Sequence, residues 1–178
     1  MRVSDRMVIL SDGNTNDIGQ AIFDEFVRSG HSGKHFQLQD MNIKPCYACR
    51  GCEEKTFMRC IHRDDADLIL PYILRLKTIV VVTQITYGSF SFHSKRLMDK
   101  FLLTIDKHYG YNNGELVAGA KPTEIRFYGV GIHNNASKEE TGAFETLVNA
   151  TLRITTWEGK SIVTSSPDAN RIIKEILS

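Results

Sequence analysis

The stretch TIVVVTQITYGSFSFHSK, residues 78–95, joins an apolar run to a loop that contains aromatic residues, a glycine and several serines. The three valines at 80–82 leave no polar position in the middle of the run. Runs that are apolar at every position are typical of parallel strands buried on both faces of a sheet. Four further runs predict strands: RMVILS (6–11), KHFQLQDM (34–41), EIRFYGVG (124–131) and KSIVTS (160–165).

Segments with helical spacing separate these runs, and strand and helix alternate along the chain. This alternation predicts right-handed βαβ units and therefore an α/β fold with helices on both faces of a parallel sheet. Asp64 and Asp65 are expected to open one helix, because acidic residues favour the positive end of a helix. Residues 106–122 are predicted to form a lid or an interface element, since a loop of that length is uncommon. The other apolar sets that predict helices are Ile18, Ile22 and Phe26; Phe101, Leu102 and Ile105; Phe144, Leu147 and Leu152; and Ile172, Ile173 and Ile176.

Length and composition indicate a single domain over residues 1–178. The formal net charge is +1, so the sequence lacks the basic excess that nucleic-acid and membrane surfaces reward. No apolar run approaches the roughly 18 residues of a spanning helix. We therefore expect a cytoplasmic protein with reduced thiols, no nucleic-acid partner and no membrane partner.

Three loops, over residues 11–17, 83–95 and 129–135, are expected to meet at the carboxyl edge of the sheet, where open α/β sheets bind ligands. The turn SDGNTND (11–17) precedes a helix, whose N-terminal N–H groups suit a phosphate. An ordinary Asp-Gly turn with a helix cap explains this turn equally well. The aromatic loop (83–95) suits a flat heteroaromatic ligand, although Phe92 is expected in the core. The predicted cofactor-binding residues are Ser11, Gly13, Asn14, Thr15, Thr83, Gln84, Ile85, Tyr87, Gly88, Ser89 and Gly131.

All four cysteines lie in the predicted loop insertion 45–63, at Cys46, Cys49, Cys52 and Cys60. Three thiolates spaced by two residues, with a fourth further on, are typical of a [4Fe–4S] cluster. Structural zinc more usually shows two separated pairs, and a C-x-x-C pair is also the signature of thiol–disulfide chemistry. A cysteine motif that holds no cluster is the remaining alternative.

The run DMNIKPCYACRGC with Cys60, the loop TQITYGSFS and the triplet Gly13-Asn14-Thr15 together resemble the NADPH-dependent FMN reductase and iron–sulfur flavoprotein group of flavodoxin-like proteins. The resemblance implies a doubly wound, five-stranded parallel sheet of order 2-1-3-4-5 in three αβα layers. It also implies an FMN-dependent oxidoreductase with NAD(P)H as donor, a [4Fe–4S] cluster on the four cysteines, and a small-molecule or protein redox partner. A homodimer or homotetramer is expected on the same ground. No catalytic acid or base is assigned.

The first loop departs from the family pattern. Relatives have a longer loop of the form G-S-P-R-x-x-G-N-T, whereas only Ser11 and Asp12 precede Gly13 here. Asp12 brings a carboxylate to the place where a phosphate is expected, and two anions at close range repel. The alternative hypothesis is therefore a non-enzymatic flavodoxin-fold module that binds a metal or a cluster and has lost FMN.

Overall fold

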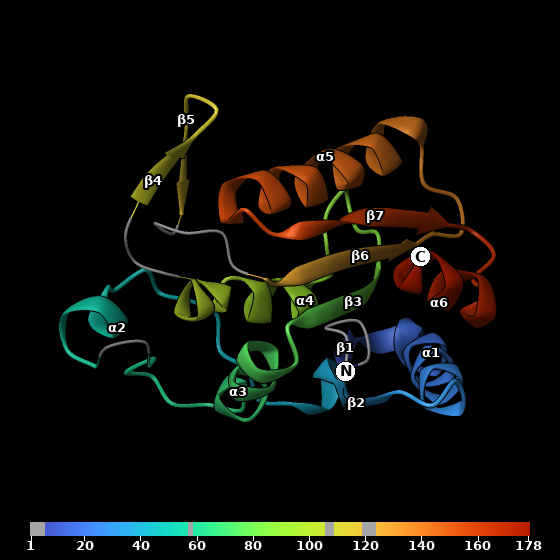
Figure 1. Cartoon of the computed structure of the whole chain (residues 1–178), viewed down its shortest axis with the longest axis horizontal. Coiled ribbons are helices and arrows are strands. Elements are labelled where there is room, and N and C mark those ends of the chain that lie inside the picture. Colours follow the sequence, from blue (N-terminus) through green and yellow to red (C-terminus); the bar gives the residue numbers. More distant parts are fainter. Residues whose placement is uncertain (1–5, 57–58, 106–108, 119–123) are drawn as a thin grey trace.

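A computed structural model describes residues 6–56, 59–105, 109–118 and 124–178. Five parallel strands form one sheet in the order β2-β1-β3-β6-β7 (Figure 1). Numbered among themselves along the chain, these strands give the predicted order 2-1-3-4-5, so the predicted flavodoxin-like α/β fold is confirmed. The strands are β1 (Arg6–Ser11), β2 (Ser32–Gln37), β3 (Thr78–Gln84), β6 (Arg126–Ile132) and β7 (Glu158–Thr164).

Helices cover both faces of the sheet because its central strands are apolar on both sides. In β1, Val8 and Leu10 belong to one core cluster, whereas Met7 and Ile9 belong to the other, as the twofold alternation of a strand requires. The first cluster includes residues of α3 (Ala66–Leu76), α4 (Phe92–Met98) and α5 (Lys138–Thr155). The second includes residues of α1 (Asn16–Arg28) and α6 (Ala169–Leu177). Among the described residues, no helix combines the length and the apolar character needed to cross a bilayer.

Some predicted elements differ in type or in length. The helix expected around Phe101 and Ile105 is wrong as an α-helix: the α-helix after β3 is α4, and a short 3₁₀ helix, η4 (Phe101–Thr104), follows it. Phe101 and Leu103 are still buried, because a single tight turn is enough to bring them into the core. The strand expected over 34–41 ends at Gln37 and is followed by another 3₁₀ helix, η3 (Leu38–Asp40).

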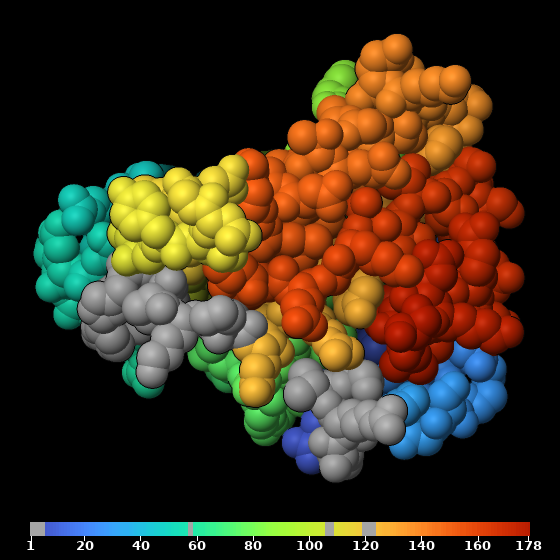
Figure 2. All heavy atoms as spheres, turned by 45° about the horizontal axis from the view of Figure 1, so that its top comes forward, coloured from blue at the N-terminus to red at the C-terminus, as the bar shows by residue number. Residues whose placement is uncertain are grey.

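Part of the predicted 106–122 connection is an antiparallel hairpin, β4 (Tyr109–Asn112) and β5 (Glu115–Ala118); residues 106–108 and 119–122 lie outside the described residues. The backbone φ angles of Asn113 and Gly114 are 50° and 83°, as the tight turns of two-residue hairpins require. The hairpin lies beside α5 and beside α2 (Gly51–Glu54), the short helix of the cysteine loop (Figure 2). An ion pair of 2.9 Å between Arg153 and Glu115 joins it to α5.

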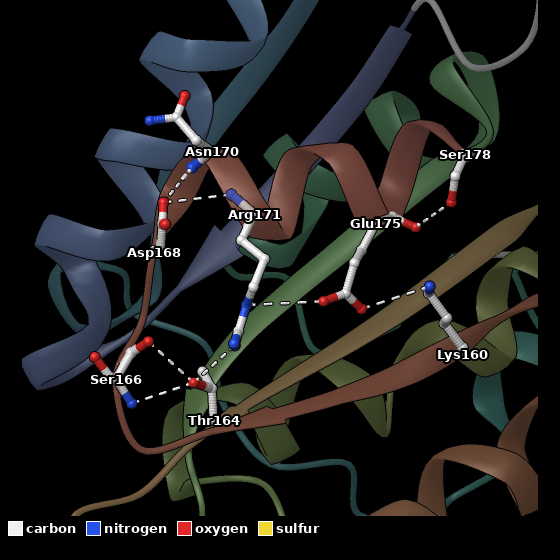
Figure 3. A network of polar contacts seen from close by, with 8 residues as sticks. All are labelled: Lys160, Thr164, Ser166, Asp168, Asn170, Arg171, Glu175 and Ser178. Atoms are coloured by element: carbon white, nitrogen blue, oxygen red, sulfur yellow. Dashed lines mark hydrogen bonds and ion pairs between the residues drawn. The ribbon is translucent and has the colours of Figure 1, made fainter.

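A polar network fastens α6 to the end of β7 (Figure 3). The Asp168 carboxylate accepts hydrogen bonds from the backbone N–H groups of Asn170 (2.9 Å) and Arg171 (3.3 Å), which caps the helix. The Arg171 guanidinium donates to the Thr164 hydroxyl at 2.9 Å. These bonds hold the last helix against the edge of the sheet.

Candidate functional site

The carboxyl ends of β1 and β3 lie side by side, with Ser11 paired in register with Val82. The chain leaves β1 towards β2 on one side, whereas β3 lies on the other side. This reversal of strand order is the switch point at which doubly wound sheets bind ligands. The loops after β1 and β3 therefore form the candidate site.

Asp12, the first residue after β1, is buried at this switch point, and only 2% of it is exposed. Its carboxylate oxygen Oδ2 accepts hydrogen bonds from the hydroxyl groups of Ser91 and Ser94, and from that of Thr83 at 3.3 Å. Thr83 ends the buried part of β3, and Ser91 is the N-cap of α4. Within the described residues no Lys, Arg or His forms an ion pair with Asp12. The charge is therefore solvated by neutral donors from three positions distant in sequence.

A second buried network lies on the other side of the same loop. The Ser11 hydroxyl is 2.7 Å from His35 Nε2 and donates to Asn16 Oδ1 at 3.0 Å. Burial lowers the pKa of His35, and the Asp24 carboxylate offsets only part of that effect, so the neutral ring is favoured. A Cβ at Gly19 would fall 2.5 Å from the Ser11 Cβ, which explains a glycine inside α1. The sequence analysis predicted no role for His35 or Gly19, although a glycine within a helical pattern can indicate such a close approach.

The turn after β3 presents a tyrosine to solvent. The backbone N–H groups of Thr86 and Ser89 each donate to the other residue's carbonyl at 3.0 Å, which closes the turn. Tyr87, at φ 50°, is 93% exposed, and Gly88 follows at φ 73°. A left-handed conformation costs a residue with a side chain roughly 1–2 kcal/mol, so the fold holds the backbone of Tyr87 against a local preference. The turn therefore presents an exposed aromatic side chain beside the switch point.

Phe92, expected in the core, is instead exposed at the start of α4, and the Arg96 guanidinium lies 4.3 Å from its ring centroid. Phe90 is the buried aromatic residue of this loop, and its ring packs 4.9 Å from that of Phe144. The alternation of the loop thus places Phe90 rather than Phe92 under α5. The predicted core assignment of Phe92 is wrong.

The predicted cofactor-binding residues divide by accessibility. Gly13, Asn14 and Tyr87 are exposed, and Gln84 and Ser89 are half-buried. Gly88 and Gly131 pack against α5, since a Cβ at either would come within 2.8 Å of a side chain there. The buried members are Ser11, Thr15, Thr83, Ile85, Gly88 and Gly131. Only the accessible residues can contact a ligand in this conformation, and the buried ones shape the loops that carry them.

A buried ion pair anchors the base of the cysteine loop. The Lys100 ammonium donates to the Asp64 carboxylate, and the two side chains are only 3% and 2% exposed. The same carboxylate accepts hydrogen bonds from the backbone N–H groups of Lys44 (2.8 Å) and Ala66 (3.0 Å). Burial alone raises the pKa of Asp64, but the hydrogen bonds from Lys100 and the two N–H groups outweigh it and hold the pKa below its usual value. As predicted, Asp64 and Asp65 precede α3, and Asp64 also joins the two ends of the loop.

The four cysteines, predicted as metal ligands, lie in two environments. Cys46 and Cys49 are exposed, whereas Cys52 and Cys60 are half-buried against the core cluster under α3. In the described part of the chain, no three His, Cys, Asp or Glu residues gather in a group that could hold a metal ion. The structure therefore gives the predicted [4Fe–4S] cluster no support, and the arrangement of the four thiols does not fit one.

The chain has the flavodoxin-like α/β fold, and solved structures share it across almost the whole chain. A flavone reductase matches with a TM-score of 0.61 and 13% identity, over 97% of this chain and 59% of its own. An FMN-dependent NADH-azoreductase from Bacillus anthracis, solved with FMN, matches with a TM-score of 0.61 and 12% identity, over 97% and 94%. An NADH:FMN oxidoreductase in its apo form matches with a TM-score of 0.58 and 13% identity, over 97% and 86%. No family model matches this sequence, and no curated protein sequence matches it.

The geometry fits one part of FMN better than the other. Tyr87 offers a ring face for stacking, with Gln84 and Ser89 at the same edge for hydrogen bonds. Near the turn at Gly13 and Asn14, however, the buried Asp12 carboxylate would repel a phosphate by about 4 kcal/mol per pair of unit charges at 4 Å. The exposed Tyr87 ring is chemically suited to stack on a flavin, whereas the buried Asp12 carboxylate is not suited to a phosphate.

Proposed function

We propose that the chain is a flavin-dependent oxidoreductase that takes electrons from NAD(P)H and passes them to a small molecule or a redox protein. The observation that carries the proposal is the exposed ring of Tyr87, held at a positive φ beside the β1/β3 switch point. The fold shared with FMN-dependent NADH reductases supports the same conclusion. A bound flavin accepts the two electrons of a hydride and can release them one or two at a time.

The accessible loop residues have distinct roles in this proposal. Tyr87 stacks on the flavin ring, while the side chains of Gln84 and Ser89 supply hydrogen bonds at its edge. Gly13 and Asn14, the exposed residues of the first loop, would contact the part of the flavin beyond its ring. Self-association as a homodimer or homotetramer stays a prediction. We propose no transfer through a cluster, because the described thiols form no ligand group.

The alternative, a non-enzymatic module that binds a metal or a cluster, has less in its favour. It needs a ligand group, and the described residues provide none of three or more members. The buried Asp12 carboxylate does favour the other part of that alternative, the loss of FMN, because it weakens the site for a phosphate. Which flavin the site prefers is therefore a separate question from whether it binds a flavin.

Flavin fluorescence tests the proposal. Titration of protein into riboflavin and into FMN is expected to quench the fluorescence of at least one of them at micromolar protein. Tyr87→Ala should weaken binding about tenfold, because a stacked ring contributes on the order of 1–3 kcal/mol. Tyr111→Ala is the matched control: Tyr111 is also largely exposed but lies on the hairpin, and its loss should leave binding unchanged.

An activity measurement completes the test. The flavin-loaded protein should oxidise NADH or NADPH in the presence of a quinone or an azo dye, and Tyr87→Ala should lower this rate with the flavin occupancy. If neither flavin is quenched at protein concentrations well above micromolar, the proposed function is wrong.

A further inference from the structure

The hydroxyl groups at the switch point already bind an anion, and that anion belongs to the chain. Thr83, Ser91 and Ser94 come from the end of β3 and the start of α4, and all three donate to one oxygen of Asp12. Short hydroxyl side chains at a strand end and a helix start are the donors that a phosphate would otherwise recruit. The fold uses them for a carboxylate instead.

These donors are not free to change partner. If they turned towards a phosphate, Asp12 would be left charged and buried without its hydrogen bonds, which is strongly unfavourable. The charge itself is also poorly screened by salt, because only 2% of Asp12 is exposed. A dianion at the Gly13–Asn14 turn would therefore meet a negative charge that is held only by neutral hydroxyl groups among the described residues, and these three hydroxyls already have an acceptor.

Asp17 provides a comparison between a buried and an exposed carboxylate near the same turn. It is also acidic and lies in the first turn of α1, but it is exposed and faces water. Its charge is screened at ordinary ionic strength, so it cannot exclude an anion as a buried carboxylate does. The two acids lie five positions apart and differ chiefly in burial.

We propose that Asp12 makes the switch-point site selective for a flavin without a phosphate. The preferred ligand class is a neutral isoalloxazine with a hydroxylated chain, of which riboflavin is the available representative. This inference rests on the proposed function, since it concerns the same site, and Asp12 acts in it as the residue that determines specificity.

The first experiment uses the unchanged protein. Riboflavin and FMN are titrated in parallel by fluorescence quenching at low and at moderate salt. Riboflavin should bind at least as tightly as FMN at both salt concentrations, because the charge of a buried carboxylate is poorly screened by salt. Binding of FMN more than tenfold tighter than riboflavin would overturn the inference and leave the proposed function standing.

The second experiment changes the charge. Asp12→Asn keeps an oxygen for the three hydroxyls and should raise FMN affinity about tenfold or more, with riboflavin affinity within about twofold of the original. Asp17→Asn should change neither affinity by more than about twofold. Equal gains for both flavins in Asp12→Asn would overturn the inference. If Asp12→Asn fails to fold, the comparison of the two flavins on the unchanged protein still decides the question. Failure of both flavins to bind the unchanged protein would instead refute the proposed function.

Discussion

The buried carboxylates of Asp64, at the base of the cysteine loop, and Asp12, at the switch point, have different partners. Asp64 is paired with the Lys100 ammonium and two backbone N–H groups. Asp12 has three hydroxyl donors and, within the described residues, no cation. The first arrangement is electrically neutral and joins parts of the fold, whereas the second keeps a net negative charge at the ligand end of the sheet.

The comparison shows that burial alone does not define the role of an acidic residue. A buried charge opposite a buried cation is satisfied locally and has little influence at a distance. A buried charge held by neutral dipoles is stable but still acts on any ion that approaches. For this reason we treat Asp64 as structural and Asp12 as a determinant of what the site accepts.

The largest effect is expected when the neutral pair is broken. Lys100→Met leaves the Asp64 carboxylate buried without its cation and should lower the free energy of unfolding by about 3–5 kcal/mol. Urea denaturation followed by circular dichroism measures this loss. Lys77→Met is the control, because Lys77 forms an exposed ion pair with Glu124 at 2.7 Å and its loss should cost far less.

The Asp64–Lys100 pair also makes the free energy of unfolding depend on pH. Because the pKa of Asp64 is lower in the folded state, its contribution to stability is present above its unfolded pKa of about 3.9 and is lost as the pH falls through the folded value. Lys100→Met should therefore lose less stability on acidification than the unchanged protein. If the free energy of unfolding falls equally on acidification in Lys100→Met and in the unchanged protein, the Asp64–Lys100 pair is not the source of the pH dependence.

A smaller effect on stability is expected at the switch point. Asp12→Asn removes the charge but leaves an amide oxygen that can accept from the same hydroxyls, so the free energy of unfolding should fall by only about 1–2 kcal/mol. The same urea titration measures it. A loss as large as that of Lys100→Met would show that the two carboxylates are alike and that Asp12 is chiefly structural.

The smallest change concerns thiol chemistry in the loop that Asp64 anchors. With Ellman's reagent, Cys46 and Cys49 should react quickly and Cys52 and Cys60 more slowly, because the second pair is half-buried. Lys100→Met should accelerate the slow pair about tenfold by loosening the base of the loop, while Asp12→Asn should leave it unchanged. Single-cysteine replacements assign the phases. Four equal rates would contradict the two environments, and so would four unreactive thiols.

The sheet could be predicted because its signals are local. Val80–Val82 are apolar at every position, and the alternation of strand and helix limits the topology to few arrangements. The short helix after β3 was misplaced because Phe101 and Leu103 reach the core from a single 3₁₀ turn, which helical spacing cannot distinguish from an α-helix.

The site was harder to predict because its contacts are not local. Asp12 was recognised as a charge near the phosphate loop, but its partners Ser91 and Ser94 are 79 and 82 residues away. Likewise, Asp64 was identified as the start of a helix, whereas its pairing with Lys100, the N-cap of η4, depends on how η4 packs beside α3. The spacing of the cysteines suggested a shared ligand, and spacing alone does not reveal that Cys52 and Cys60 pack against the core while Cys46 and Cys49 face solvent.

The β4–β5 hairpin has a practical consequence for anyone who wishes to label or fuse this protein. Its tip, Asn113-Gly114, is exposed, and a Cβ at Gly114 would meet no neighbour within 4 Å. Exposed loop tips made of small and polar residues are the sites at which chains best accept inserted sequence. An epitope or a fluorescent reporter placed there would stand away from the switch point, and it would leave both buried carboxylates and their partners intact.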